Sequence, residues 1–372
     1  MEFANWTALT QATLVQHEQY NAKVHTLALI TAAATFPLIF MGGLVTSHQA
    51  GMSVPDWPNS WGYNMFTFPP SKWVGGILFE HTHRLAGAFV GFLTVVLMIA
   101  AWWTDRRRWM RWTATAIVLA ACAQGTIGGL RVVLSNRDLA IVHGCAAQVF
   151  FCFVAGYCVM TSRFWARREN LPKDELPATR TALKLAVTAV VVILIQLVIG
   201  AVMRHSDAGL AIPDFPTSYG HLMPPTRLDS AFRQQAIHRY GSELGLSRVS
   251  LFQIWINFSH RIGAAVVSAA VISLCVTILL RLRHQRAFAT PACIALLLLV
   301  TQVTLGILTV LLRKPADVAS AHVAIGSLLL VTVWVVAVRA FGGVSASRDA
   351  ALTAIRDFNM QPRNARIDFF AR

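Results

Sequence analysis

Charged residues are scarce in this sequence, and acidic residues are the scarcest. Only 13% of the 372 residues are charged, 17 of them Asp or Glu, whereas 55% are hydrophobic. The mean hydropathy is +0.54. Soluble domains carry about 25% charged residues, so this scarcity argues against a soluble protein and indicates a membrane protein.

The few charges are mostly basic, giving a net charge of +15. They do not form a continuous binding face. They gather in short runs between apolar stretches, as at 105–108 and 281–286. This pattern is typical of loops on the cytoplasmic side of a membrane, and we expect no nucleic-acid partner.

The connecting loops lack cysteine. All six cysteines fall within apolar segments, which excludes a loop disulfide and favours small buried side chains. Residues 1–24 also lack the pattern of a secretory signal or an organelle-targeting peptide. The absent transit peptide favours a bacterial source.

Long apolar runs are what the sequence has in abundance. Eight stretches reach the length of about 20 residues that a helix needs to cross a bilayer. They lie near 26–46, 76–103, 113–132, 139–162, 183–203, 252–280, 291–312 and 319–340. The sequence therefore predicts an all-α integral membrane protein with eight transmembrane helices and the lipid bilayer as its surroundings.

The distribution of Arg and Lys predicts the orientation. Loops 104–112, 163–182 and 281–290 are rich in them, which places both termini in the cytoplasm. The 204–251 loop also carries several arginines, but long loops cross the membrane largely regardless of charge. We therefore expect a multi-pass protein of the bacterial cytoplasmic (inner) membrane.

The sequence contains an internal repeat. Residues 51–62 reappear as 209–220, His83-Arg84-Leu85 reappears as His260-Arg261-Ile262, and His143 corresponds to His322. The repeat predicts two tandem, pseudo-symmetric four-helix bundles in the same orientation, related by an axis along the membrane normal. We place the bundles at 1–162 and 183–340, with a cytoplasmic connector at 163–182 and a cytoplasmic tail at 341–372.

Each copy carries two histidines within apolar spans. The four are His83, His143, His260 and His322. All four lie early in even-numbered spans, which predicts a position in the outer, periplasmic half of the membrane. A polar imidazole is costly in hydrocarbon and tends to be kept for a function. Two imidazoles per bundle suit the axial positions of a haem better than zinc, which needs three or four ligands. The alternative is an interhelical hydrogen bond.

Glycines and arginines accompany the histidines. Small residues beside them would let a wide ring approach the backbone, or would allow ordinary close helix packing. These are Gly87, Gly144, Gly263 and Gly326. Arg84 and Arg261 could pair with haem propionates, or could extend towards the membrane surface.

Other polar residues have less specific interpretations. His81 has no counterpart, since Phe258 stands there, and is assigned no role. The matched Gln124 and Gln302 favour polar contacts between helices. Asp56 and Asp214 favour turns or helix caps. We expect the remaining outer-loop histidines at the surface: His48, His205, His221 and His238.

The two copies differ at one position. Glu80 lies one helical turn before His83, and Asn257 stands at the matching position before His260. A carboxyl within the membrane usually faces a cavity and takes part in chemistry. This difference predicts the reaction site in the N-terminal bundle and a permanent haem in the C-terminal bundle. The alternative is that Glu80 only bonds a neighbouring histidine or arginine.

Together, Glu80-His-Thr-His83-Arg84, the two Pro-Asp-Trp/Phe-Pro loops, Phe258-Ser-His260-Arg261 and Ser320-Ala-His322 form a recognisable set. The chain resembles the haem A synthase family (CtaA/Cox15) over nearly its whole length. The resemblance implies an oxidoreductase that converts the C8 methyl group of haem O to a formyl group, with water as the oxygen source.

The resemblance also implies roles for the histidines. His83 and His143, with Arg84, would bind the substrate haem and its iron, with Glu80 as the catalytic residue. His260 and His322, with Arg261, would bind a haem b cofactor through its iron, and electrons would leave through it. Some bacterial relatives carry a cysteine pair in the outer loops, and its absence here excludes any mechanism that needs it.

The partners follow only from the resemblance. It implies haem O as substrate and a haem O synthase as a candidate partner, and the product haem A would serve terminal oxidases. The electron acceptor stays open, with a quinone as one candidate, and so does a homo-oligomeric state. Two rival functions also stay open: a non-enzymatic dihaem cytochrome b for membrane electron transfer, and a haem transporter or chaperone.

Overall fold

The computed structural model describes residues 20–168 and 172–360. Within these residues, eight helices are long and apolar enough to cross a membrane. They are α2 (Ala22–Ser47), α3 (Gly76–Thr104), α4 (Arg108–Val133), α5 (Arg137–Thr161), α7 (Leu176–His205), α9 (Leu251–Arg281), α10 (Arg286–Leu311) and α11 (Ala316–Met360). The prediction of an all-α integral membrane protein with eight spans is confirmed.

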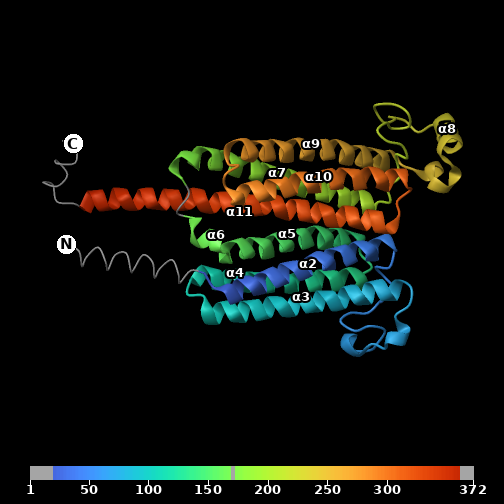
Figure 1. Cartoon of the computed structure of the whole chain (residues 1–372). Coiled ribbons are helices and arrows are strands. Elements are labelled where there is room, and N and C mark those ends of the chain that lie inside the picture. Colours follow the sequence, from blue (N-terminus) through green and yellow to red (C-terminus); the bar gives the residue numbers. More distant parts are fainter. Residues whose placement is uncertain (1–19, 169–171, 361–372) are drawn as a thin grey trace.

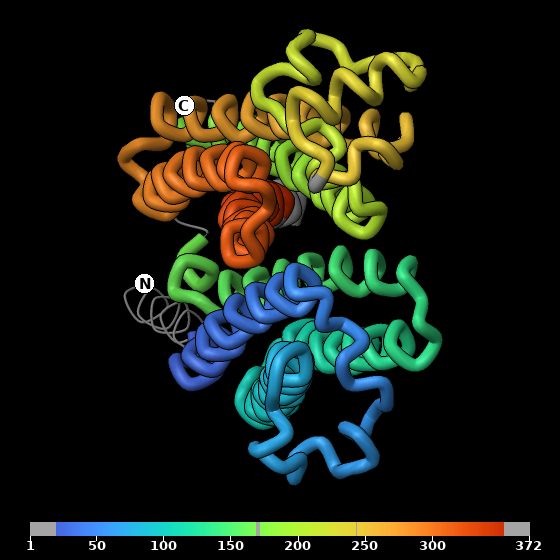
Figure 2. The backbone as a smooth tube through the Cα atoms, turned by 90° about the vertical axis from the view of Figure 1, so that its right-hand side faces the viewer, coloured from blue at the N-terminus to red at the C-terminus, as the bar shows by residue number. Residues whose placement is uncertain are grey.

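The helices pack as two groups of four. Helices α2, α3, α4 and α5 pack in a ring in which each contacts the next, and α7, α9, α10 and α11 form a second ring. Figure 1 shows the two groups side by side with their long axes roughly parallel, and Figure 2 views them from the end that carries the long loops. The rings meet where α11 packs on α2 and α5, and where α5 packs on α7.

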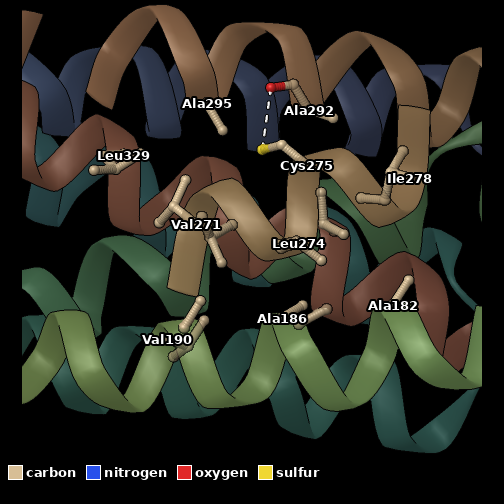
Figure 3. Packing of buried hydrophobic residues seen from close by; sticks show 14 of the residues in the cluster. Ala182, Ala186, Val190, Val271, Leu274, Cys275, Ile278, Ala292, Ala295 and Leu329 are labelled. Atoms are coloured by element: carbon tan, nitrogen blue, oxygen red, sulfur yellow. Dashed lines mark hydrogen bonds between the residues drawn. The ribbon is translucent and has the colours of Figure 1, made fainter. Parts of the chain in front are cut away.

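Apolar side chains face both inward and outward. The interior of the second ring is packed from small and branched residues such as Ala186, Val271 and Leu274 (Figure 3). On the outside, Leu280 is 75% exposed and Leu297 is 68% exposed. Such wide apolar exposure is unfavourable in water and is expected of helices that face lipid.

Three parts of the chain differ from the sequence prediction. Helix α7 begins at Leu176, inside the predicted connector. Pro177 lies in its first turn, where a backbone N–H would have no partner within the helix, so the proline breaks no helical hydrogen bond. Helix α11 continues to Met360, past the predicted end at 340, since no proline interrupts it. The long second loop contains the helix α8 (Ser230–Tyr240), which packs on its own apolar cluster around Tyr219 and Leu246.

A polar junction joins the two rings near the loop end. The Arg204 guanidinium of α7 donates to the carbonyl oxygen of Gly43 at 2.7 Å and to Ser47 Oγ at 2.6 Å. Ser47 Oγ lies 2.9 Å from Ser320 Oγ of α11. A methyl group on Gly43 would lie only 3.2 Å from Ser320 Cβ, so the two helices approach closely here.

Candidate functional site: two facing histidine pairs

The structure brings the four predicted histidines together in two pairs. The ring centroids of His83 and His143 are 6.5 Å apart, and those of His260 and His322 are 6.4 Å apart. Each pair joins helices that are not neighbours in their ring, α3 with α5 and α9 with α11. The two imidazoles of each pair therefore face each other across the interior of their bundle, on opposite helices rather than on neighbouring ones as expected.

The separation fits one metal ion held between two imidazoles. A metal–nitrogen bond is about 2 Å long, and a ring nitrogen lies about 1.1 Å from its centroid, so opposite axial imidazoles place their centroids about 6.2 Å apart. Both observed separations agree with this value to within a few tenths of an ångström. In the described part of the chain, neither pair has a third His, Cys, Asp or Glu placed to share the ion.

A glycine on the preceding helix seats each imidazole. A methyl group on Gly42 would lie 3.0 Å from His83 Cε1, and one on Gly128 would lie 2.9 Å from His143 Cε1. Gly200 and Gly306 meet His260 and His322 at 2.9 Å and 3.0 Å in the same way. The sequence analysis missed this role. Gly42 and Gly200 share the 158-residue offset of the repeated loops (200 − 42), which was the available signal.

The glycines singled out from the sequence contact other groups. Gly263 lies against the Gln196 side chain, and a methyl group on Gly326 would lie 3.0 Å from Gln302 Nε2. A side chain on Gly87 would only graze Leu38, and one on Gly144 would meet open space. Gly87 and Gly144 therefore leave room for a close approach in the N-terminal bundle, whereas glutamine side chains cover Gly263 and Gly326 in the C-terminal one.

The glycine seats can be tested with a matched pair of variants. Gly128→Ala should push the His143 ring out of place, because overpacking a tight contact costs about 1–3 kcal/mol. We expect haem affinity in the N-terminal bundle to fall about ten-fold, as measured by titration followed in the Soret band. Gly125→Ala on the same helix meets open space and should change nothing. Equal effects of the two substitutions would contradict the seating role.

Hydrogen bonds prepare His322 to bind a metal. Its Nδ1–H donates to the backbone carbonyl of Gln302 at 3.1 Å, which leaves the lone pair on Nε2. The Gln302 side-chain nitrogen lies 3.3 Å from that Nε2. The prediction that Gln302 makes a polar contact between helices is confirmed. The matching Gln124 Oε1 is buried without a hydrogen-bond partner among the described residues.

His260 has a side-chain partner that His83 lacks. The Gln196 amide lies 3.0 Å from His260 Nδ1, and its nitrogen donates to the His260 carbonyl oxygen at 2.7 Å. The matching residue in the first half is Leu38, and the Nδ1 atoms of His83 and His143 have no hydrogen-bond partner among the described residues. The imidazoles of the second bundle are therefore held more firmly.

The two arginines beside the histidines hold the repeated loops. Arg84 donates to the carbonyl oxygens of Val54 and Asp56, both at 2.6 Å. Arg261 donates to those of Ile212 at 3.0 Å and Thr217 at 2.9 Å. Each guanidinium fastens the loop that closes its bundle. Propionate binding by Arg84 and Arg261 stays a prediction.

The repeated loops are tight turns built on an aspartate. Asp56 accepts the backbone N–H of Trp61 and Gly62, both at 2.7 Å, and Asp214 accepts those of Tyr219 and Gly220, both at 2.8 Å. The prediction that both aspartates are turn residues is confirmed.

The pKa of Asp56 lies below its usual range. Burial opposes ionisation, but the N–H groups of Gly62 and Trp61, with Arg84 nearby, outweigh it. Asp56 is therefore ionised at neutral pH, and its hold on the turn weakens only as the pH falls through that lowered pKa.

Glu80 is buried beneath the first loop. Only 1% of its surface is exposed. Its Oε1 pairs with Arg84 at 2.9 Å, and its Oε2 accepts the N–H of Val54 at 2.9 Å. The matching Asn257 donates to the carbonyl oxygen of Ala208 at 2.9 Å. The position therefore anchors the loop in both halves, but only the first half carries a carboxylate there.

His81 has a structural role that the sequence did not indicate. Its ring is fully buried between Phe68 and Trp73, and its Nδ1 lies 3.2 Å from Ser60 Oγ. It therefore secures the first loop rather than a metal. Of the histidines expected at the surface, His48, His221 and His238 are exposed, whereas His205 lies half-buried in the last turn of α7 because that helix runs past the predicted end.

Fold and site together define a multi-pass helical membrane protein with a duplicated pair of facing histidines. The family model described as COX15-CtaA, cytochrome oxidase assembly protein, matches residues 71–335. The chain therefore belongs to the COX15-CtaA family of cytochrome oxidase assembly proteins.

Curated relatives agree with this membership. A protein named heme A synthase from Rhizorhabdus wittichii is 26% identical over 339 residues, which cover 81% of this chain and 89% of the relative. Proteins of the same name from Chelativorans sp. and Shouchella clausii are each 25% identical, covering 79% and 77% of this chain and 84% and 86% of theirs.

Proposed function

We propose that this protein is a haem A synthase that oxidises the C8 methyl group of haem O to a formyl group. Family membership and the names of the relatives support haem A synthesis. One structural observation carries the assignment of roles. Two equivalent histidine pairs are present, and among the described residues only the first has a buried carboxylate, Glu80, one helical turn from one of its histidines.

The N-terminal bundle is proposed as the substrate site. His83 and His143 would hold the iron of haem O, and Glu80 lies one helical turn before His83. With water as the oxygen source, each hydroxylation of the methyl group releases electrons and protons in equal number. Glu80 would accept a proton or stabilise positive charge developing at the methyl carbon.

The C-terminal bundle is proposed as the site of a resident haem b. His260 and His322 have the separation that fits it, and their hydrogen bonds to Gln196 and Gln302 keep the rings in place. When bound, haem b would accept electrons singly and pass them to an acceptor, for which a quinone is a candidate. The chain's own contribution is to orient the two imidazoles and to close the bundle with the second loop.

The proposed setting is the bacterial cytoplasmic membrane, with both termini in the cytoplasm and the histidine pairs near the periplasmic face. In Figure 1 the long loops lie at one end of the bundles. The N-terminal end of α2 and the C-terminal end of α11 lie at the opposite end. The basic loops 104–112 and 281–290 also lie at that other end, in accord with the positive-inside rule.

Pigment analysis tests the function. Membranes containing this chain and a source of haem O should accumulate haem A, identified by chromatography and mass spectrometry of extracted haems. Membranes with the haem O source alone are the control. Two bound haems with haem O left unchanged would contradict the proposal and favour a dihaem cytochrome b. Reversible binding without conversion would favour a haem carrier.

A further inference from the structure

A second arginine lies in the N-terminal site, and neither the family match nor the sequence pattern assigns it a role. Arg131 comes from the last turn of α4 and is mostly buried. It is close enough to His83, His143 and Glu80 to interact electrostatically with all three. Its guanidinium packs on the first loop, 3.2 Å from the place a methyl group on Gly51 would take.

Arg131 lacks a partner of opposite charge. Among the described residues its guanidinium forms no hydrogen bond or ion pair, in contrast to that of Arg84. The nearby carboxylate cannot serve, because Oε1 of Glu80 is paired with Arg84 and Oε2 with the N–H of Val54. The ionised Asp56, which lies near Arg84, is likewise occupied, because its two oxygens accept the N–H groups of Trp61 and Gly62. A buried charge without a partner is unfavourable, so such a site favours an anionic ligand.

The second bundle has no equivalent of Arg131. Gly128 corresponds to Gly306, so the residue matching Arg131 is Thr309, whose hydroxyl donates to the carbonyl oxygen of Leu305 in its own helix. The arginine near His322 is Arg204, and it is hydrogen-bonded to α2. The free guanidinium is therefore a feature of the first site alone.

We propose that Arg131 binds a propionate carboxylate of the substrate haem. This inference rests on the proposed function, since it needs a haem between His83 and His143. A guanidinium and a carboxylate can form two parallel charge-assisted hydrogen bonds, which orient the ligand as well as attract it. Because the porphyrin is otherwise free to turn about the axis between its two axial ligands, a fixed propionate would select which edge, and hence which methyl group, faces Glu80.

The test compares two ligands on two proteins. The protein is purified with its haem b from cells without a haem O source, and its N-terminal site is titrated with ferric protohaem or with protohaem dimethyl ester, whose propionates are uncharged. Wild-type protein should bind protohaem more tightly than the ester. Arg131→Gln should lower the affinity for protohaem about ten-fold or more and leave that for the ester nearly unchanged.

Controls separate this role from others. Arg131→Lys should retain part of the preference for protohaem. Arg137→Gln, which removes an exposed arginine from the start of α5, should retain all of it. Haem b content in the same molecule reports folding of each variant. If Arg131 only stabilises the end of α4, both ligands will weaken equally or not at all, and the inference is then wrong.

Failure of the proposed function would look different. In that case wild-type protein would take up neither ligand through its first histidine pair, and His83→Ala would not alter the spectrum of the added haem. Uptake through His83 without discrimination between the acid and the ester would overturn only the role of Arg131.

Discussion

Replacing His322 by alanine is expected to remove haem b from the C-terminal bundle and to abolish haem A formation. His322 faces His260 with 6.4 Å between their ring centroids, and the hydrogen bond from its Nδ1–H to the Gln302 carbonyl oxygen puts its lone pair on Nε2. The substitution removes one of two axial ligands. Loss of an outer partner of a metal ligand already costs about 10- to 100-fold in affinity, so loss of the ligand should cost at least that.

The measurement is haem b per chain, from pyridine haemochrome spectra, together with haem A output. His238→Ala is a suitable control because it removes an exposed histidine from α8. His83→Ala should keep haem b and lose only the substrate site. Normal haem b content after His322→Ala would show that the second pair does not hold the cofactor, and the division of labour between the bundles would then be wrong.

The second large effect is expected from Glu80→Gln. The amide keeps an oxygen that can accept the N–H of Val54, but it lacks the negative charge that pairs with Arg84. A residue that takes a proton or stabilises charge in the transition state contributes about 10²–10⁴-fold. Haem A output should therefore fall at least 100-fold, with haem O or the alcohol intermediate accumulating.

Binding measurements distinguish chemistry from loop closure. If Glu80 acts in the reaction, Glu80→Gln should bind haem O nearly as well as the native chain while turnover is lost. If Glu80 only anchors the first loop, haem O affinity should fall together with activity. Asp174→Asn, at an exposed carboxyl far from the site, is the control. Unchanged haem A output from Glu80→Gln would remove Glu80 from the mechanism.

Much of the architecture was predictable because the repeat carries it. A bilayer demands long apolar helices, and the offset between copies aligned His83 with His260 and His143 with His322 before any geometry was known. Equal depth within one bundle predicted that the imidazoles of each pair lie close together, but the expectation that they lie on neighbouring helices was wrong, since each pair joins opposite helices. The contrast between Glu80 and Asn257 was visible for the same reason.

The partners of the site residues were not predictable in the same way. Arg84 can reach either a propionate or a backbone carbonyl, and only the path of the loop decides that it meets Val54 and Asp56. The glycine seats depend on the rotation of one helix against another, which periodicity alone does not determine. His81 was left without a role because its aromatic neighbours, Phe68 and Trp73, come from an irregular loop.

The junction at Gly43 limits how freely the halves can be recombined. Gly43 follows the glycine that seats His83, and it meets Ser320, two residues before His322. A chimaera that joins the first half of one relative to the second half of another would keep every helix. It would still need compatible residues at positions 43, 204 and 320. A larger side chain at this junction would displace His83 in the first half and His322 in the second half together.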